Sequence, residues 1–194
     1  MAPTDDRQAT AFHEAGHFVA SLEREGFVRQ EISIVPDDER QSLGHSTTED
    51  PWPRPEESGW RFAVEEVEAL VVELFAGYAA QVRRFPSARA AARLGASTDN
   101  ERARDYLRSL PKGSRARLRA RTRRVVARRW PEICALAKEL LDRGRLDGDE
   151  AELVCDVAAG RVSQADLDRW RMLRPEAPSA SLARFERLAP NGHL

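Results

Sequence analysis

The chain has 194 residues, of which 41% are hydrophobic and 32% are charged, and its formal net charge at pH 7 is −1. This length and composition predict one domain with a hydrophobic core, alone or with a tail, and argue against disorder over the whole chain. No apolar run is long enough to cross a membrane, the first residues lack the features of a signal peptide, and Cys134 and Cys155 form no metal or redox pattern. We therefore expect a cytoplasmic protein with no membrane partner, whose cysteines are core thiols in a reducing compartment.

The N-terminal part of the chain predicts one helix, two strands and a loop. Small and apolar residues recur at three- and four-residue spacing over 4–25, which predicts a helix that Gly26 ends. Residues 31–35 alternate and are rich in β-branched side chains, which predicts a short strand, and 43–48 can form a second, antiparallel strand. Three prolines within 50–58 predict a loop.

The rest of the chain is predicted to be helical. A broad apolar stripe over 59–84 predicts a long helix, and Gly77 within it indicates close approach by another backbone. Residues 95–98 look like a turn, and Gly144 and Gly148 bracket another. We expect further helices over 99–110, 115–143, 150–159 and 163–171, with a kink or split at Pro131 in the second of these.

These elements predict a mainly α fold with a small antiparallel β-sheet. Ser163 and Asp166 fit a capping box at the start of the last helix. The residues from Pro175 onward are rich in Pro, Ala and Ser, which predicts a loose tail. We therefore expect one domain over 1–160, followed by a C-terminal helix and tail over 161–194.

The most informative motif is His-Glu-Ala-Gly-His at residues 13–17, inside the first predicted helix. Because His13 and His17 are one turn apart, both imidazoles can reach one tetrahedral zinc ion. Glu14 lies beside that position and can accept a proton from water, as in the HExxH arrangement of zinc peptidases. The motif therefore predicts a metal-assisted hydrolase.

A catalytic zinc site needs a third protein ligand and an open position for water. The motif is not followed by a further histidine at the metzincin spacing. Local spacing does not choose among the candidates that remain, which are His45, Glu65, Glu66, Glu68, Glu73 and Asp99.

Several stretches in order resemble the peptidase domain of the FtsH-type (AAA-linked) zinc metalloproteases. The resemblance covers about residues 8–154 and is carried by the HEAGH helix at 11–17, the strand pair at 32–36 and 42–46, Ala-Gly-Tyr-Ala-Ala-Gln at 76–81, Gly-Ala-Ser-Thr-Asp-Asn-Glu-Arg-Ala at 95–103, and Leu-Asp-Gly-Asp-Glu at 146–150. It implies a zincin-like helical metallopeptidase domain with zinc as cofactor.

The resemblance also implies roles for single residues. Asp99 stands at the position of the third zinc ligand, beside His13 and His17, with Glu14 as the general base. Gly44 and His45 stand in the strand pair near the expected cleft and are our candidates for substrate binding. His45 replaces a family tyrosine, and the alternative is that it is an exposed strand residue. An extended peptide would pair with an edge of that sheet. The implied activity is that of a zinc metalloendopeptidase acting on protein or peptide substrates.

Some residues depart from the family pattern. Gln81 replaces a family glutamate and Thr98 replaces a family asparagine, which weakens the expected support of the metal ligands. The sequence contains no phosphate-binding GxxxxGK[ST] loop, so we expect peptidase activity without an ATPase in this chain and a separate ATPase or adaptor protein as partner. The alternative is a catalytically weak peptidase-like binding or regulatory protein that retains zinc.

Arginine is concentrated in one acid-free block. Residues 106–131 contain no Asp or Glu, and eight arginines lie between Lys112 and Pro131. The block carries few aromatic residues and no nucleic-acid fold motif, so we do not expect nucleic-acid binding. It is better interpreted as a solvated helix face that could dock an acidic partner or substrate.

Overall fold

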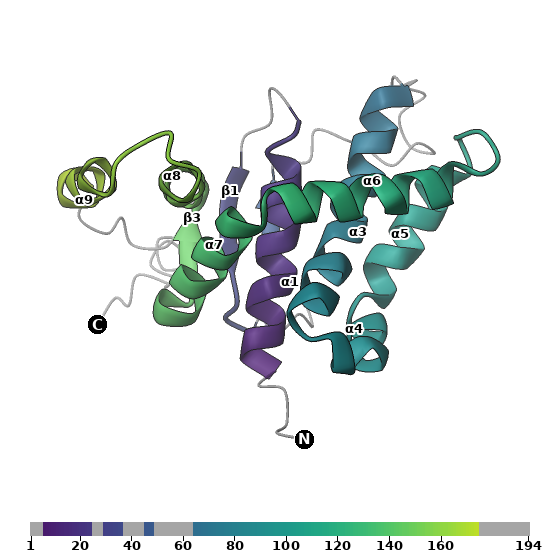
Figure 1. The fold of residues 1–194 in the computed structure, drawn as a ribbon, viewed down its shortest axis with the longest axis horizontal. Helices are drawn as coiled ribbons and strands as arrows, with labels where there is room; N and C mark the ends of the chain where they lie inside the picture. The colour runs from purple at the N-terminus through teal and green to yellow at the C-terminus, as the bar shows by residue number, and fades with distance from the viewer. Residues whose placement is uncertain (1–5, 25–28, 37–44, 49–63, 175–194) are drawn as a thin grey trace, which may run out of the picture.

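The structure is a computed structural model that describes residues 6–24, 29–36, 45–48 and 64–174. The described chain is mainly helical with a small antiparallel sheet, as the sequence predicted (Figure 1). Its helices are α1 Asp6–Ser21, α3 Val64–Arg84, α4 Arg89–Gly95, α5 Ser97–Leu107, α6 Ser114–Arg128, α7 Trp130–Arg143, α8 Gly148–Ala158 and α9 Gln164–Leu173, with a short 3₁₀ turn at Pro86–Ala88. Its strands are β1 Arg29–Ser33, β2 His45–Thr48 and β3 Arg145–Asp147.

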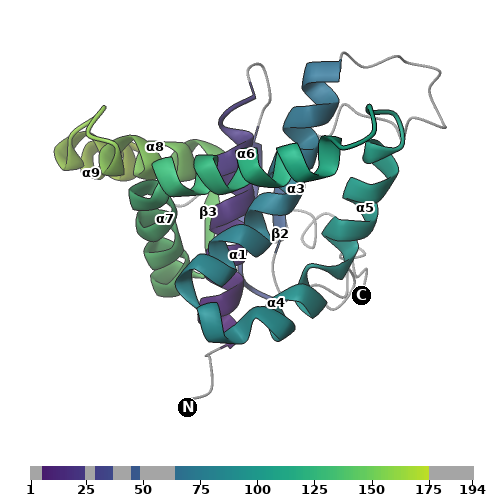
Figure 2. The ribbon, with the colours of Figure 1, turned by 45° about the vertical axis from the view of Figure 1, so that its right-hand side comes forward.

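Helix α1 lies in the middle of the molecule and packs chiefly on α3 and α7. Helix α6 crosses in front of α1 and α3, and the strands lie behind them (Figure 2). Apolar side chains from α1, α3, α6 and α7 meet in one core, whose fully buried members include Phe18, Val71, Leu118 and Leu136. Because α1 is covered on several sides, side chains on its surface are held in place by its neighbours.

The sheet has three strands in the order β2-β1-β3, both pairs antiparallel. The two predicted strands are present, but the expected turn between Gly144 and Gly148 is wrong, because this segment forms β3. Ile32 of β1 lies opposite Leu146 of β3, and both side chains are buried. A strand of three residues with one apolar side chain leaves no alternating pattern for sequence analysis to detect.

The predicted helix over 115–143 is two helices. Helix α6 ends at Arg128 and α7 begins at Trp130, so the expected split occurs just before Pro131. Proline is tolerated in the first turn of a helix, where its missing N–H would have no partner within the helix. The turn expected over 95–98 is present but shorter, because Ala96 alone separates α4, which ends at Gly95, from α5, which begins at Ser97.

The capping box at the start of α9 is confirmed. The Ser163 hydroxyl accepts from the Asp166 backbone N–H, and the Asp166 carboxylate accepts from the Ser163 backbone N–H. Leu167 of α9 is buried in the same core as α1 and α3, and the division at residue 160 stays a prediction. The predicted tail from Pro175 lies outside the described residues. Of the two expected core thiols, Cys155 is buried and Cys134 is half-buried, and neither is in a disulfide.

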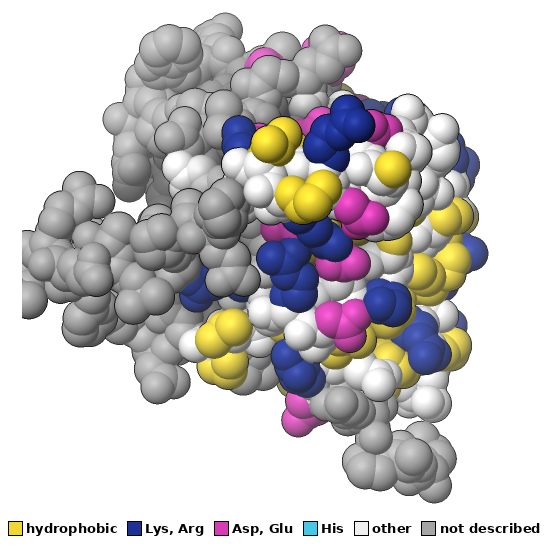
Figure 3. All heavy atoms as spheres, turned by 90° about the vertical axis from the view of Figure 1, so that its left-hand side faces the viewer, with side chains coloured by type: hydrophobic (Ala, Val, Ile, Leu, Met, Phe, Trp, Pro, Cys, Tyr) yellow, Lys and Arg dark blue, Asp and Glu magenta, His cyan; other side chains and the backbone are white. Residues whose placement is uncertain are grey.

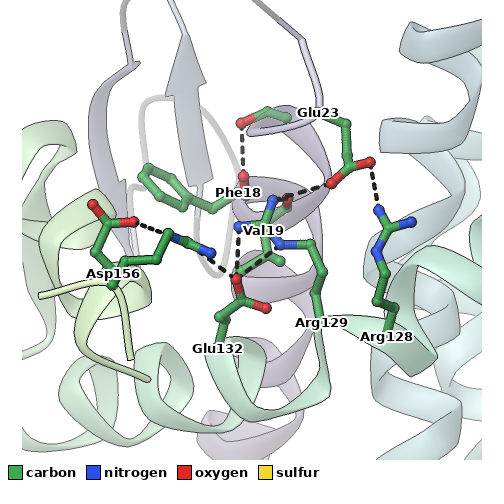
Figure 4. A network of polar contacts seen from close by, with 9 residues as sticks. Phe18, Val19, Glu23, Arg128, Arg129, Glu132 and Asp156 are labelled. Carbon is green, nitrogen blue, oxygen red and sulfur yellow. Dashed lines mark hydrogen bonds and ion pairs between the residues drawn. The ribbon is translucent and has the colours of Figure 1, made fainter. Parts of the chain in front are cut away.

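Buried charges join the C-terminal end of α1 to α7 and α8 (Figure 4). The Arg129 guanidinium donates to the Val19 carbonyl at 3.0 Å and to the Glu132 carboxylate at 2.8 Å. Arg161, beyond α8, donates to the same carboxylate at 3.3 Å. Because these groups are paired inside the protein, they fix how α1 and α7 sit against each other without leaving a buried charge uncompensated.

At Gly16, α1 packs so closely on α3 that there is no room for a side chain. A Cβ at this position would lie 2.7 Å from the Ala76 carbonyl oxygen and 2.8 Å from the Ala80 Cβ. We expect Gly16→Ala to lower the free energy of unfolding by about 1 kcal/mol or more, since overpacking against backbone outweighs the helix propensity gained. Urea denaturation followed by circular dichroism measures the change.

Gly95→Ala is the matched control for that substitution. No heavy atom lies within 4 Å of a Cβ built on Gly95. Its stability should therefore equal or slightly exceed that of the wild type. Equal unfolding midpoints for Gly16→Ala and the wild type would contradict the close approach of α1 and α3.

Candidate metal centre

Three side chains from two helices converge on one point. His13 and His17 project from successive turns of α1, and their Nε2 atoms are 3.0 Å apart. Asp99, in the first turn of α5, places Oδ2 3.1 Å from His13 Nε2 and 3.2 Å from His17 Nε2. The three side chains are mostly buried, with 13%, 12% and 20% of their surface exposed. We call these residues the triad.

Helix α3 holds both imidazole rings from behind. His17 Nδ1 donates to the Glu73 backbone carbonyl at 2.9 Å, and His13 Nδ1 donates to Gln81 Oε1 at 3.3 Å. A carbonyl oxygen can only accept, so each Nδ1 carries a proton and each Nε2 faces the triad centre, where a metal ion could replace any proton on it. Both rings are therefore oriented as metal-ligating histidines are.

Gly77 makes room for this arrangement. A Cβ at Gly77 would lie 2.7 Å from His17 Cδ2 and 2.9 Å from His13 Cε1. The close approach expected at Gly77 is thus made by two imidazole rings rather than by another backbone. The sequence signal was a lone glycine in a helix, which does not tell side-chain contact from backbone contact.

The triad has strong internal electrostatics when it holds no metal. Burial acts to lower the pKa of His17, but the Asp99 carboxylate and smaller contributions from Glu14 and the Glu73 carbonyl raise it to about 9. Burial acts to raise the pKa of Asp99, but His17 and His13 hold it well below the usual range for a carboxyl. The site is therefore built to stabilise a positive charge at its centre.

The donor set and its spacing fit a tetrahedral cation. Ligand atoms about 2.0–2.1 Å from a zinc ion lie roughly 3.3 Å apart, close to the observed separations of 3.0, 3.1 and 3.2 Å. Three protein ligands leave a fourth position for water or substrate, as catalytic zinc sites require. A search of the described residues for clusters of His, Cys, Asp or Glu side chains that could hold a metal ion finds the triad.

Glu14 stands beside the triad without belonging to it. It follows His13 in α1, only 8% of its surface is exposed, and its charge acts on His17. A carboxylate next to a metal position, but not among the ligands, is placed to exchange protons with a bound water. The role of general base that the motif predicted for Glu14 stays a prediction.

The glutamates considered as third ligands have other partners or other positions. Glu68 pairs with Arg117 and Arg121, and the hydrogen bond from Arg117 lowers its pKa. The Glu73 carboxylate accepts from Arg24 at 2.7 Å, while its backbone carbonyl orients His17. Glu65 and Glu66 are exposed at the start of α3. Among the carboxylates of these residues and of Asp99, that of Asp99 is the one in contact with both histidine rings.

The expected substrate-binding residues are described only in part. The backbone of His45 begins β2 opposite Ser33 of β1, and Gly44 lies outside the described residues. Their predicted contact with substrate stays a prediction. Of the two departures from the family pattern, Gln81 contacts His13, whereas Thr98 is exposed in the first turn of α5.

One surface hollow of about 660 Å³ lies away from the triad, beside the buried Arg129. Its polar lining includes Glu23, Arg128 and Arg161, which already pair with neighbouring charges. The charged groups around the hollow are therefore already paired with one another, so they do not form a ready binding site for a ligand.

None of the helices in the described part of the chain is long and apolar enough to cross a membrane.

Comparison with protein-family models and with curated proteins identified no related protein. The sequence matches no protein-family model, and none of the curated proteins compared with it is similar. The resemblance to the FtsH-type peptidases thus rests on the motifs and stays a prediction.

Proposed function

We propose that this protein is a zinc-dependent endopeptidase that hydrolyses unfolded or flexible polypeptides without an ATPase of its own. The observation that carries the proposal is the convergence of His13, His17 and Asp99 on one point, with Glu14 beside it. Two imidazoles and one carboxylate suit zinc among the common protein metals. His13, His17 and Asp99 would hold the ion.

When bound, zinc acidifies a water molecule and polarises a peptide carbonyl. The chain itself supplies the proton transfers and the orientation. Glu14 accepts a proton from the attacking water and returns it to the leaving amine. The Glu73 carbonyl and Gln81 keep the rings of His17 and His13 turned toward the site.

An extended substrate would pair with an outer strand of the sheet. Strand β1 has partners on both sides within the described sheet, so β2 and β3 present the outer edges. Backbone pairing at such an edge aligns a peptide bond without selecting a side chain. Folded proteins lack free strands for this pairing, so a separate ATPase or adaptor protein would deliver them. The two free thiols suit a reducing compartment such as the cytoplasm.

One observation favours the alternative, a zinc-retaining protein with weak catalysis. The partner of His13 Nδ1 is the neutral amide of Gln81, at 3.3 Å. A carboxylate in that position would make the histidine a stronger ligand, so the amide weakens support for the metal. Retained zinc with negligible turnover would identify this second function.

Metal removal tests the proposal. Purified protein should contain one zinc per chain and should cleave casein. Dialysis against a chelator should abolish cleavage, and added zinc should restore it, because the triad is the source of the activity. Absence of bound zinc from protein purified in zinc-containing buffer would contradict the metal centre. Full zinc occupancy without any cleavage would reject the endopeptidase in favour of the alternative.

A further inference from the structure

Six of the seven arginines of α6 form two rows on the helix, and the two rows have different neighbours. Arg117, Arg121 and Arg128 lie on one side of the buried stripe of α6, and Arg115, Arg119 and Arg123 lie on the other, at four-residue intervals. Each arginine of the first row has an acidic partner, since Arg117 and Arg121 share Glu68 and Arg128 pairs with Glu23. The two rows differ in charge compensation although they share one helix.

No acidic side chain of the described residues pairs with the second row. Arg119 lies over the Phe75 ring, with its guanidinium carbon 5.1 Å from the ring centroid. Its charged neighbours are Arg115 and Arg123 on the same helix and Arg93 on α4. We call Arg93, Arg115, Arg119 and Arg123 the arginine face.

Like charges gather there because two acid-free stretches meet in space. Residues 74–98 contain no Asp or Glu, and neither do residues 106–131. Helix α6 packs on α3, and Arg93 of α4 lies close enough for its charge to act on Arg119. Partial burial, Arg115, Arg93 and Arg123 together lower the pKa of Arg119, with Tyr78 opposing them. The uncompensated repulsion is relieved when an anion binds.

Basic and acidic side chains are mixed on another face of the described chain. The face that carries α8 and α9 mixes them throughout (Figure 3). There, Arg171 donates to Glu139 at 2.6 Å and to Glu150 at 2.7 Å, and Arg174 pairs with Asp149 at 3.0 Å. The arginine face thus differs from that face, on a chain whose net charge is −1.

We propose that the arginine face binds an acidic segment of another protein. Successive guanidiniums at four-residue spacing on α6 are about 6 Å apart along the helix axis. Alternate side chains of an extended strand are about 6.5–7 Å apart. Glutamates or aspartates at every second position of an extended segment therefore match Arg115, Arg119 and Arg123, and each carboxylate can accept two hydrogen bonds from a guanidinium.

The same observations favour protein over nucleic acid. Phe75 is only 5% exposed beneath Arg119, so its ring offers no platform on which a base can stack, and Tyr78, which also acts on Arg119, is half-buried. A net charge of −1 also supplies no long-range attraction for a nucleic acid. A short acidic segment can bind through the local positive potential of the arginine face alone.

This surface is separate from the triad. Phe75 and Gly77 are two positions apart on α3, and two residues turn about 200° around a helix. Arg119 lies over Phe75, whereas the histidine rings lie against Gly77. Binding at the arginine face therefore goes beyond the proposed peptidase activity, and the two can fail independently.

Fluorescence anisotropy with a peptide of alternating glutamate and serine tests the proposal on the full chain at low ionic strength. The triple variant Arg115→Gln/Arg119→Gln/Arg123→Gln should bind this peptide about tenfold more weakly than the wild type. The matched control, Arg117→Gln/Arg121→Gln/Arg128→Gln, removes the same charge from the same helix and should change affinity by about twofold or less. Both variants should keep the zinc content and helical circular dichroism of the wild type, because the substituted side chains are largely exposed.

Three outcomes would overturn the proposal. One is no binding of the glutamate peptide, or equal binding of a glutamine counterpart. Another is an equal loss of peptide affinity in the two triple variants, which would mean that binding depends on the net charge of the protein and not on the arginine face. The third is tighter binding of single-stranded or duplex DNA than of the peptide through the same arginines, which would assign the arginine face to nucleic acid instead.

Discussion

Glu14→Gln should bind one zinc ion as tightly as the wild type and cleave casein about 10²–10⁴-fold more slowly. The amide keeps the size of the carboxylate but cannot accept a proton from water. Glu14 is buried beside His17 and is not one of the three converging ligands, so its replacement leaves the metal ligands intact. Zinc content by atomic absorption and initial rates of casein cleavage measure the two effects separately.

The control for Glu14→Gln is Glu101→Gln. Glu101 is exposed on α5, two positions after Asp99, and the substitution makes the same change of acid to amide. Its zinc content and cleavage rate should equal those of the wild type. Unchanged cleavage by Glu14→Gln would refute the assigned general base, and loss of zinc from that variant would mean that Glu14 acts through the metal ligands.

Gly77→Ala should fold but bind zinc about 10–100-fold more weakly, the range seen when groups that orient metal ligands are altered. The new Cβ would lie 2.7 Å from His17 Cδ2 and 2.9 Å from His13 Cε1. Side chains can rotate away where backbone cannot, so the strain is relieved by turning the two rings from their ligating positions. Alanine is also the better helix former. Zinc titration against a competing chelator, with the urea midpoint as a check on folding, gives the result.

The contrast with Gly16→Ala makes this prediction specific. Both substitutions add one methyl group at the contact of α1 with α3, but the atoms nearest to the new methyl group at Gly16 are the Ala76 carbonyl oxygen and the Ala80 Cβ, which cannot rotate away. Gly16→Ala should therefore lower stability, and Gly77→Ala should chiefly lower zinc affinity. If Gly77→Ala keeps wild-type zinc affinity, the rings do not hold the metal in the orientation described.

Periodicity predicted most of the helical architecture. The stripe over 59–84 anticipated α3, whose described bounds are Val64–Arg84, and Pro131 marked the break between α6 and α7. Helix α4 was missed because Ala92 is its one buried residue, so it has no apolar stripe to detect. Such elements depend on their neighbours rather than on their own pattern.

The site was predictable where its chemistry is carried by side chains in one helix. His13 and His17 share a face of α1 by spacing alone, and the structure bears out that geometry. The placement of Asp99 depends on how α5 packs, which no local spacing contains, and only the family resemblance singled it out. The hydrogen bond from His17 to the backbone carbonyl of Glu73 could not be predicted, because every residue has a backbone carbonyl and the sequence does not show which one will orient a metal ligand.

The triad also determines how firmly α5 is attached. His13 and Asp99 are 86 positions apart, and α5 buries only Ala103 and Tyr106 of its own side chains. An ion shared by α1 and α5 would act as a removable cross-link that closes this long chain segment. By mass action, any contact that stabilises the packing of α5 on α1 raises the affinity for the metal ion. Removal of the metal ion conversely favours local unfolding of α5, while the core formed by α1, α3 and α7 stays folded. Metal occupancy and local unfolding of α5 are thus two measures of one equilibrium.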